Sequence, residues 1–258
     1  MNTILFNKII FGPVFSRRLG RSLGINLLPT NKKCCNFNCI YCECGWTTKN
    51  NIEKEEFPPA ILVKEALEKR LNELIATGQE IDNITFAGNG EPTMHPEFIK
   101  IIEDTISIRN KLMNNVKISV LTNATSLANS KILEALNKID NCILKLDTGK
   151  ESTFKIINQP VSNITLGEIV NNIKKFKGKI IIQSLFVKGF INNTKIDNTT
   201  EEEINDWLKL IKEIKPELIM IYPIARPTPS GNLEKISNEK LKTIAEKVIK
   251  SGIKAIAY

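Results

Sequence analysis

Three cysteines near the start of the chain have a spacing that suits metal chemistry. Cys35, Cys39 and Cys42 form the pattern C-x3-C-x2-C, within a stretch that holds five of the six cysteines. A short loop with this spacing can wrap three thiolates around one face of an iron–sulfur cubane and leave one iron without a protein ligand. An iron with an open position can bind and activate a small molecule, which a fully ligated electron carrier cannot do. The spacing therefore predicts a reactive cluster.

Two other uses of these cysteines have to be weighed. A structural zinc site usually takes four Cys or His ligands, and here the fourth would be Cys34 or Cys44, since the only histidine, His95, lies elsewhere. A two-cluster ferredoxin needs a second set of cysteines, which the sequence lacks. A non-enzymatic zinc or electron-transfer protein stays open as an alternative. We expect Cys34, Cys44 and Cys142 to be small buried or spare residues.

A second chemically suggestive stretch is Gly88-Asn89-Gly90-Glu91, which follows the short apolar run 84–87. Glycine lets the backbone come close to a ligand, and Asn tolerates the same unusual dihedral angles. Glu91 offers a carboxylate to a cationic group. Gly-Asn-Gly is also an ordinary turn, but its position one strand after the cysteines favours a shared site.

Alternating strands and helices are expected to position these groups. We predict strands at 23–28, 84–87, 116–121, 142–146, 179–187, 218–222 and 253–257, and helices at 58–78, 96–113, 130–139, 150–157, 166–176, 201–214 and 237–250. Repeated strand–helix units imply an α/β fold with a parallel sheet and helices outside. Six such units are fewer than the eight of a closed barrel.

The chain is expected to form a single domain over residues 1–258, with residues 1–22 as an extended N-terminal extension. Residues 188–200 are the best candidate for a long mobile loop. The first helix is expected to bury one apolar stripe, made of Ile61, Leu62, Ala66, Leu67, Leu71, Leu74 and Ile75.

The composition is that of an ordinary globular protein with a basic balance. The formal net charge is +8, which indicates either a polyanionic partner such as RNA or a genome biased towards Lys, Asn and Ile. The N-terminus lacks the features of a signal peptide, and no apolar run reaches the ~20 residues of a membrane span. We therefore expect a cytoplasmic protein with no membrane partner. There thiols stay reduced, which favours metal binding over disulfides.

Together, the cysteine and glutamate stretches resemble the radical SAM superfamily. Members of this family carry the motif CxxxCxΦC, in which Φ is aromatic, and its three cysteines bind a 4Fe–4S cluster. Cys35, Cys39 and Cys42 match the cluster ligands. Tyr41 matches the aromatic residue that packs near the adenine of S-adenosylmethionine (SAM). The resemblance implies that the amino and carboxylate groups of SAM chelate the fourth iron.

The family also has a Gly-Gly-Glu stretch after its second strand, which holds the methionine amino group of SAM. Gly90 and Glu91 match this stretch, and Asn89 stands where the first glycine usually lies. The resemblance implies a partial (β/α)6 TIM-like barrel and an external electron donor of the flavodoxin or ferredoxin type. The reduced cluster would cleave SAM into methionine and a 5′-deoxyadenosyl radical, and this radical would take a hydrogen atom from the substrate.

Further cofactor-binding candidates lie at the ends of later strands. Asn123 follows the third strand, and Lys145 and Asp147 share one face of the next strand by alternation. Gln183 is a polar residue within an apolar strand. Each of these could instead be a solvated loop residue or a core polar group with satisfied hydrogen bonds. Tyr222 and Arg226 at the end of the sixth strand are weaker candidates.

The substrate is the least constrained part of the prediction. Residues 16–26 look like those of a subgroup related to wyosine-type tRNA-modifying enzymes, and the basic charge agrees with an RNA substrate. A glycyl-radical-enzyme activase or a peptide-modifying enzyme is the alternative. Many peptide modifiers carry further clusters, and the lack of any cysteine after Cys142 argues against that kind.

Overall fold

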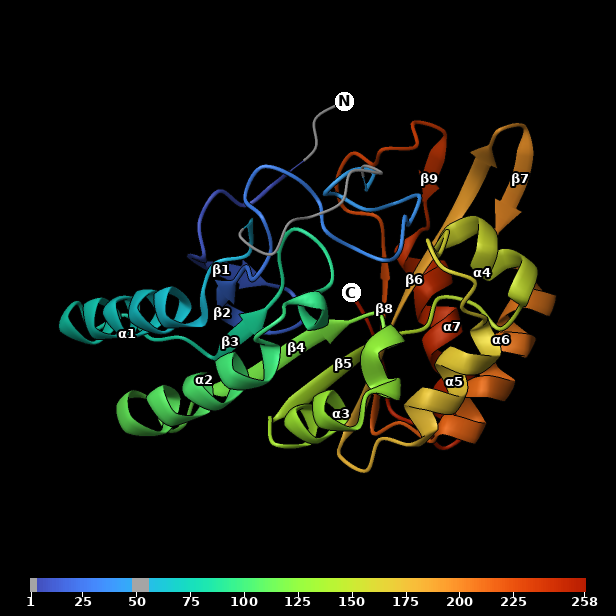
Figure 1. Cartoon of the computed structure of the whole chain (residues 1–258). Coiled ribbons are helices and arrows are strands. Elements are labelled where there is room, and N and C mark those ends of the chain that lie inside the picture. Colours follow the sequence, from blue (N-terminus) through green and yellow to red (C-terminus); the bar gives the residue numbers. More distant parts are fainter. Residues whose placement is uncertain (1–3, 48–55) are drawn as a thin grey trace.

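The computed structural model describes residues 4–47 and 56–258, which form a mixed sheet with helices along its outer face (Figure 1). The strands are β1 (Ile10–Ser16), β2 (Gly20–Ile25), β3 (Asn83–Phe86), β4 (Lys117–Thr122), β5 (Asn141–Lys145), β6 (Ile180–Ile191), β7 (Thr194–Asp197), β8 (Leu218–Pro223), β9 (Leu233–Lys235) and β10 (Ala255–Ala257). The helices are α1 (Ala60–Ala76), α2 (Phe98–Leu112), α3 (Ser130–Asn137), α4 (Glu151–Ile157), α5 (Leu166–Lys174), α6 (Glu201–Ile214) and α7 (Asn238–Lys250). No helix in these ranges is both long and apolar enough to cross a membrane.

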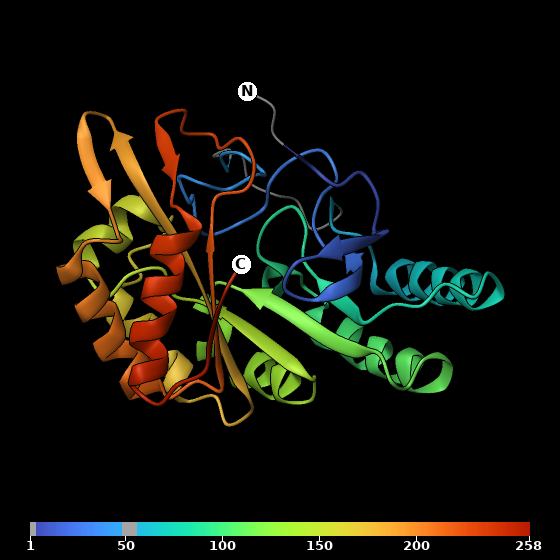
Figure 2. The ribbon, with the colours of Figure 1, turned by 180° about the vertical axis from the view of Figure 1, so that it is seen from behind.

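The main path of the sheet follows the order β1-β2-β3-β4-β5-β6-β8-β10. Neighbours on this path are parallel, except that β1 runs antiparallel to β2 at the edge. Among the described strands no pairing joins β10 back to β1, so the curved sheet stays open (Figure 2). Each strand from β2 to β8 on this path is followed by at least one helix, and β10 is the seventh parallel strand. The predicted α/β partial barrel is confirmed.

Local sequence explains where several helices begin. The Thr200 hydroxyl accepts a hydrogen bond from the Glu203 backbone N–H at the start of α6, and acidic residues fill the first turn. Ser237 caps α7 in the same way through the Lys240 N–H. Helix α1 begins directly after Pro59, and Gly78, with a φ of +64°, follows its end.

The expected apolar stripe of α1 is wrong in part. Leu67, Leu71 and Leu74 are buried as predicted, but Val63 and Ala60 complete the buried seam. The seam therefore repeats at three- and four-residue steps along a single face of the helix. Three predicted members lie beside this face and are about half exposed, namely Ile61, Leu62 and Ile75.

A small apolar cluster lies on the inner face of the sheet, near the amino ends of its strands. Ile143, Ile181 and Met220 come from β5, β6 and β8, and Leu19 reaches them from the turn between β1 and β2. Residues 10–16 and 20–22, which were expected to belong to an N-terminal extension, thus form β1 and the first half of β2. Residues 1–3 lie outside the described residues.

The prediction of a long loop at residues 188–200 is wrong. Strand β6 continues to Ile191 and turns back into β7, while β9 pairs with the other edge of β6. The turn residues Asn192 and Asn193 have φ values of 45° and 65°, as a two-residue hairpin turn of type I′ requires. Asn-Asn is a weaker sequence signal for a hairpin turn than Asn-Gly, which explains why the sequence did not predict this hairpin. We call residues 187–191, 194–197 and 233–235 the upper sheet (Figure 1).

Candidate functional site

The predicted cofactor residues gather at the carboxyl ends of β2 to β6, around one cavity of about 150 Å³ that we call the cysteine cavity. Nine of the eleven predicted residues line it; Asn89 and Asp147 do not. The predicted residues in the lining are Cys35, Cys39, Tyr41, Cys42, Gly90, Glu91, Asn123, Lys145 and Gln183, and the others are Lys33, Phe37, Cys44, Gly88, Leu121 and Thr122.

Backbone pairing with the glutamate stretch fixes the start of the cysteine loop. The Cys34 N–H donates to the Asn89 carbonyl at 2.8 Å, and the Glu91 N–H donates to the Cys34 carbonyl at 3.0 Å. A Cβ atom on Gly90 would lie 1.7 Å from the Cys34 carbonyl oxygen, and Gly90 has a φ of +144°. Only glycine allows the two segments to approach this closely.

Two of the three predicted ligand thiols receive N–H donors. The Phe37 N–H points to the Cys35 sulfur at 3.4 Å, and the Asn158 amide points to the Cys39 sulfur at 3.5 Å. Burial raises the pKa of both cysteines. The neighbouring Cys44 thiol lowers the pKa of Cys42 to about 5, and Cys42 in turn raises the pKa of Cys44. N–H donors of this kind stabilise metal-bound thiolate.

The three predicted ligand cysteines line the same cavity. In residues 4–47 and 56–258, no group of three or more Cys, His, Asp or Glu side chains is placed to hold one metal ion. The thiolates of a cubane bind different irons and so stand further apart than the ligands of one ion. A shared cavity, buried thiols and N–H donors to sulfur are the features that such a cluster requires.

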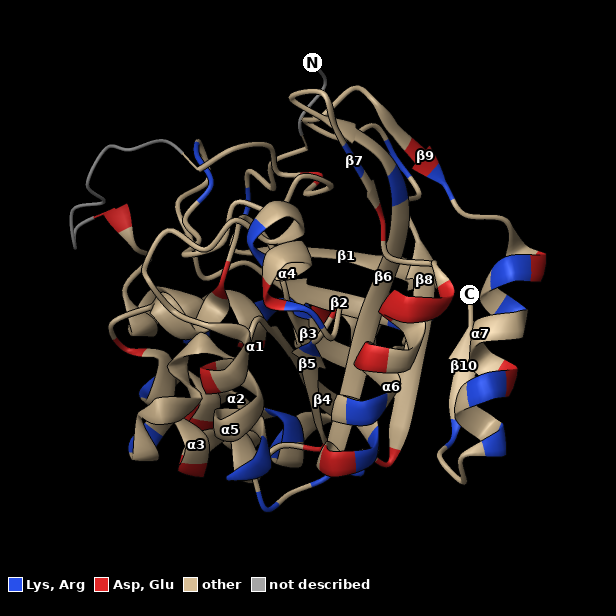
Figure 3. Ribbon diagram, turned by 90° about the vertical axis from the view of Figure 1, so that its right-hand side faces the viewer, with Lys and Arg blue, Asp and Glu red and all other residues tan. Residues whose placement is uncertain are grey.

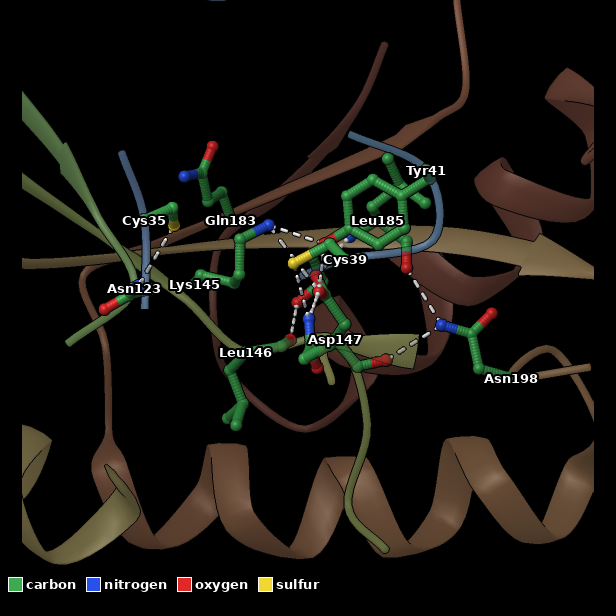
Figure 4. Close-up of polar contacts among 12 residues, drawn as sticks. Cys35, Cys39, Tyr41, Asn123, Lys145, Leu146, Asp147, Gln183, Leu185 and Asn198 are labelled. Atoms are coloured by element: carbon green, nitrogen blue, oxygen red, sulfur yellow. Dashed lines mark hydrogen bonds and ion pairs between the residues drawn. The ribbon is translucent and has the colours of Figure 1, made fainter. Parts of the chain in front are cut away.

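Tyr41 joins a buried network with Lys145 and Asp147 beside Cys39 (Figure 4). The Tyr41 hydroxyl donates to the Asp147 carboxylate, and the Lys145 ammonium lies 2.5 Å from that hydroxyl and 3.6 Å from the carboxylate. Burial is the largest single influence and opposes the Lys145 charge, but the nearby Asp147 carboxylate together with Tyr222, Cys39 and Cys42 outweighs it, so the pKa of Lys145 is raised. The network therefore holds a cation near the thiol of Cys39.

Asp147 also connects neighbouring elements. Its carboxylate accepts from the Leu185 N–H on β6 at 2.9 Å and from the Asn158 amide at 2.8 Å. The pair Lys145 and Asp147 was predicted to share the inner face, and both do meet Tyr41. Asp147 acts on the cavity through Tyr41 and Lys145, since it does not line the cavity itself.

Glu91 is buried and links the ends of β3 and β4. Its Oε1 accepts from the Thr93 N–H, the Thr93 hydroxyl and the Thr122 hydroxyl, while its Oε2 accepts from the Asn123 N–H at 2.7 Å. Burial raises the pKa of Glu91, and these hydrogen bonds oppose that shift. The Asn123 amide in turn donates to the Asn36 side chain at 2.6 Å and lies 3.8 Å from the Cys35 sulfur.

Asn89 points away from the cysteine cavity. Its amide donates to the Phe6 and Pro29 carbonyls at 2.9 Å and 2.8 Å, and its side-chain oxygen accepts from the Phe6 N–H. The carboxamide thus fastens the N-terminal segment to the loop after β3. This contact gives a physical reason for asparagine where the family has glycine.

Sequence reasoning missed three groups near the cavity. Lys33 is buried and donates to the Gly45 carbonyl at 3.0 Å, and Asn158 bridges Asp147 and Cys39. Arg18 donates to the Gln183 side chain at 2.8 Å and lies 4.2 Å over the Tyr222 ring. Arg18 lies within residues 16–26, which the sequence analysis singled out, but only the folded hairpin of β1 and β2 shows that it reaches β6 and β8.

The weaker candidates have structural contacts. Arg226 forms an exposed ion pair with Glu43 of the cysteine loop at 2.8 Å. His95 is buried, with Nδ1 accepting from the Glu97 N–H at 3.0 Å and Nε2 lying 2.9 Å from the Pro58 carbonyl. Cys142 lies on β5 in the hydrophobic core, as expected of a small buried residue.

Comparisons with known proteins assign the family. Residues 33–220 match the model of the Radical SAM superfamily. A UPF0026 protein of Helicobacter pylori is 33% identical over 239 residues, which cover 90% of this chain and 71% of that protein. A GTPase Obg of Brachyspira hyodysenteriae is 31% identical over 92% of this chain, but the chain spans only 33% of that protein's length.

One relative and one solved structure add context. A probable dual-specificity RNA methyltransferase RlmN of Thermotoga petrophila is 25% identical over 86% of this chain and 60% of its own length. The crystal structure of a radical SAM methyltransferase from Sphaerobacter thermophilus has a TM-score of 0.66 at 14% identity, covering 92% of this chain and 65% of that one. This likeness shows the fold.

These matches overturn the alternative of a non-enzymatic zinc or electron-transfer protein. The family model covers both the cysteine loop and the strands β3 to β6. The chain belongs to the radical SAM superfamily, as a SAM-dependent enzyme whose cofactors are a 4Fe–4S cluster and SAM.

Proposed function

We propose that Cys35, Cys39 and Cys42 bind the 4Fe–4S cluster and that the enzyme acts on RNA by hydrogen abstraction. The observation that carries the first part is the cysteine cavity, where the three thiols meet and where N–H donors from Phe37 and Asn158 point to two of them. Cys34, Cys44 and Cys142 are not ligands in this proposal. An external flavodoxin or ferredoxin supplies the electron.

The residues opposite the thiols are suited to hold SAM. The Glu91 Oε1 accepts three hydrogen bonds, whereas Oε2 accepts one from the Asn123 N–H. Oε2 accepts fewer hydrogen bonds than Oε1 and so has more capacity left to accept the methionine amino group. Gly90 lets this backbone lie against the cysteine loop. Lys145 and Gln183 line the same cavity.

The chain's own part in the reaction is to orient the reactants and exclude water. A reduced cluster held by Cys35, Cys39 and Cys42 would supply the electron for cleavage of SAM into methionine and a 5′-deoxyadenosyl radical, which would take hydrogen from the substrate. Tyr41 and Asp147 are buried and hold Lys145 near Cys39. A fixed cation close to a thiolate favours the added negative charge of the reduced state.

RNA is the proposed substrate class. The net charge of +8 favours a polyanionic partner. One relative over most of the chain carries the name of an RNA methyltransferase, and that protein's activity is brought here only as support. The stretch at residues 16–26, similar to wyosine-type tRNA-modifying enzymes, agrees with this substrate class. Charge-driven RNA binding predicts an affinity that falls steeply as salt rises.

Two measurements on anaerobically reconstituted protein test the proposal. Iron analysis and SAM cleavage after reduction should give about four irons per chain and release of methionine. RNA affinity, measured between about 50 and 200 mM salt, should fall by at least tenfold. A colourless zinc protein contradicts the cluster assignment. RNA affinity that does not respond to salt contradicts the substrate class and leaves the cluster assignment standing.

A further inference from the structure

A second hollow lies on the same face of the barrel, between the cysteine loop and the upper sheet. This rim cavity has a volume of about 480 Å³, within the range of ~300–1,000 Å³ that is typical of ligand sites. No charged side chain occurs among the described residues that line it. Its side chains include two aromatic rings and four carboxamides, from Trp46, Phe190, Asn38, Gln159, Asn192 and Asn232.

The two rings are unusually exposed for their size. Trp46 is 39% exposed and Phe190 is 49% exposed, whereas the other tryptophan, Trp207, is buried in the core. Large exposed aromatic side chains cost solvation free energy and mark binding surfaces when they gather around one hollow. An aromatic ring also offers a stacking face to any planar heterocycle.

Hydrogen bonds fix the backbone at Phe190 and on both sides of Trp46. Next to Trp46, the Gly45 N–H donates to the Cys42 carbonyl at 2.9 Å and the Thr47 N–H donates to the Asn38 side chain at 2.7 Å. The Phe190 N–H donates to the Asn232 carbonyl at 3.0 Å. The rim cavity is therefore largely formed before any ligand binds, which lowers the entropic cost of binding.

The carboxamides give the cavity hydrogen-bonding groups without charge. The amide of Asn, like that of Gln, carries both a donor and an acceptor and can pair with the edge of a nucleobase. Gln159 has a φ of 42°, a conformation that is rare for its type, and its carbonyl accepts from the Asn38 N–H at 3.0 Å. Such local strain is concentrated at binding sites.

A neighbouring hollow and nearby lysines extend the surface. A second cavity of about 450 Å³ shares Phe190 and Asn232 with the rim cavity. The strands of the upper sheet carry basic residues (Figure 3). Lys188 pairs with Glu234, whereas neither Lys195 nor Lys235 forms an ion pair with a described acidic residue. Free ammonium groups beside stacking faces suit a phosphate backbone.

We propose that the rim cavity binds an unpaired nucleobase of the RNA substrate, with Trp46 and Phe190 as its stacking faces. Single-stranded RNA is recognised mainly by stacking on aromatic side chains and by hydrogen bonds to base edges. The site rests on the proposed function, since it supposes that RNA is the substrate. It places the bound base next to Asn38, which lies in the loop that carries Cys35 and Cys39.

The test is binding of a single-stranded oligoribonucleotide to the reconstituted enzyme. We expect the Phe190→Ala and Trp46→Ala variants to weaken this binding by about 5- to 150-fold. The matched control is Phe15→Ala, because Phe15 is 82% exposed on β1 and lines neither cavity. Bound RNA should quench tryptophan fluorescence in the parent enzyme, and Trp46→Phe should remove that quenching while Trp207 still emits.

The outcomes separate this site from the proposed function. Equal affinities for the Phe190→Ala, Trp46→Ala and Phe15→Ala variants overturn the site, as does equal binding of single strand and duplex. Either result leaves an RNA substrate in place, provided that the parent enzyme binds RNA with the expected salt dependence. Quenching of Trp46 by an aromatic peptide, with none by the oligoribonucleotide, overturns the site in favour of a peptide ligand.

Discussion

The two ends of the sheet place their charged groups in opposite ways. At the amino ends of the strands lies a hollow of about 810 Å³, the base hollow, far larger than the cysteine cavity of about 150 Å³. Three of its charged groups pair with each other, Arg21 with Glu80 at 3.0 Å and with Asp82 at 3.3 Å, and their side chains are 46% to 77% exposed. At the carboxyl ends, Lys145 and Asp147 are 16% and 0% exposed.

The difference shows that the size of a hollow does not mark the site. Exposed ion pairs are screened by water and exert little field on a ligand. Buried charges act through a medium of lower effective dielectric constant, so each of them matters more to a thiolate or a ligand nearby. The same parallel strands supply both ends, and helices cover the outside of both (Figure 2). The carboxyl end is distinguished by buried thiol, carboxylate and ammonium groups that gather around one cavity.

The largest expected effect comes from removing a thiol at the carboxyl end. Cys39→Ala should abolish SAM cleavage and lower the iron content, because Cys39 lines the cysteine cavity and its sulfur receives the Asn158 amide. Cys142→Ala is the matched control, since Cys142 is equally buried but lies in the hydrophobic core. Iron analysis and methionine release measure both. Equal losses in the two variants would show that the ligand assignment is wrong.

The order of the elements followed from the sequence because each has a local cause. Apolar strands and helical periods repeated regularly, and caps such as Thr200 marked helix starts. The upper sheet was missed because its turn uses Asn192 and Asn193 and because β9 is only three residues long. Pairing of such short strands depends on distant partners, which local patterns do not record.

The candidate site shows the same division between residues that carry a local sequence signal and residues that only the fold brings together. Cys35, Cys39 and Cys42 carry a spacing that is visible in the chain, and all three line the cysteine cavity. Asn158 has no such signal, because it follows a short helix and meets Cys39 only through the fold. The direction in which a side chain points was also not predictable from the sequence. The motif put Asn89 at the cofactor, whereas its amide faces the N-terminal segment.

A smaller effect is expected on the free energy of unfolding, and it should differ between substitutions at the two ends of the sheet. Asp147→Asn leaves the Lys145 ammonium without its buried carboxylate and should lower the free energy of unfolding by about 3–5 kcal/mol. Asp82→Asn at the base should change it far less, because both partners there are exposed. Urea unfolding of the two variants measures the difference. The double variant Lys145→Met with Asp147→Asn should recover part of the loss, because no unpaired charge remains.

Similar destabilisation by Asp147→Asn and Asp82→Asn would contradict the contrast between the two ends. It would mean that water reaches the network of Tyr41, Lys145 and Asp147 as freely as it reaches the base. A loss in Asp147→Asn that persists fully in the double variant points instead to the Leu185 and Asn158 contacts of Asp147. In that case the carboxylate serves β6 and α4 more than it serves the cation.

The smallest expected effect is a pH dependence at His95, the only histidine in the chain. Burial lowers the pKa of His95 in the folded state, whereas the unfolded chain protonates near pH 6.5. As the pH falls through about 6.5 the unfolded state takes up more protons, so stability present above this pH should be lost. At the base, Arg21 lowers the pKa of Asp82, and that contribution is lost only in the acid range.

The His95→Asn variant isolates the contribution of His95 to the pH dependence of stability. The Asn side-chain oxygen can accept the Glu97 N–H that Nδ1 accepts now, but it does not titrate. The loss in unfolding midpoint between about pH 7.5 and 5.5 should therefore be smaller in the variant than in the parent. The buried Glu91, whose pKa is raised, contributes equally in both proteins and cancels. Identical pH profiles would show that water reaches the His95 side chain. The buried region at the carboxyl end would then not extend to the 3₁₀ turn Pro92–Met94, which directly precedes His95.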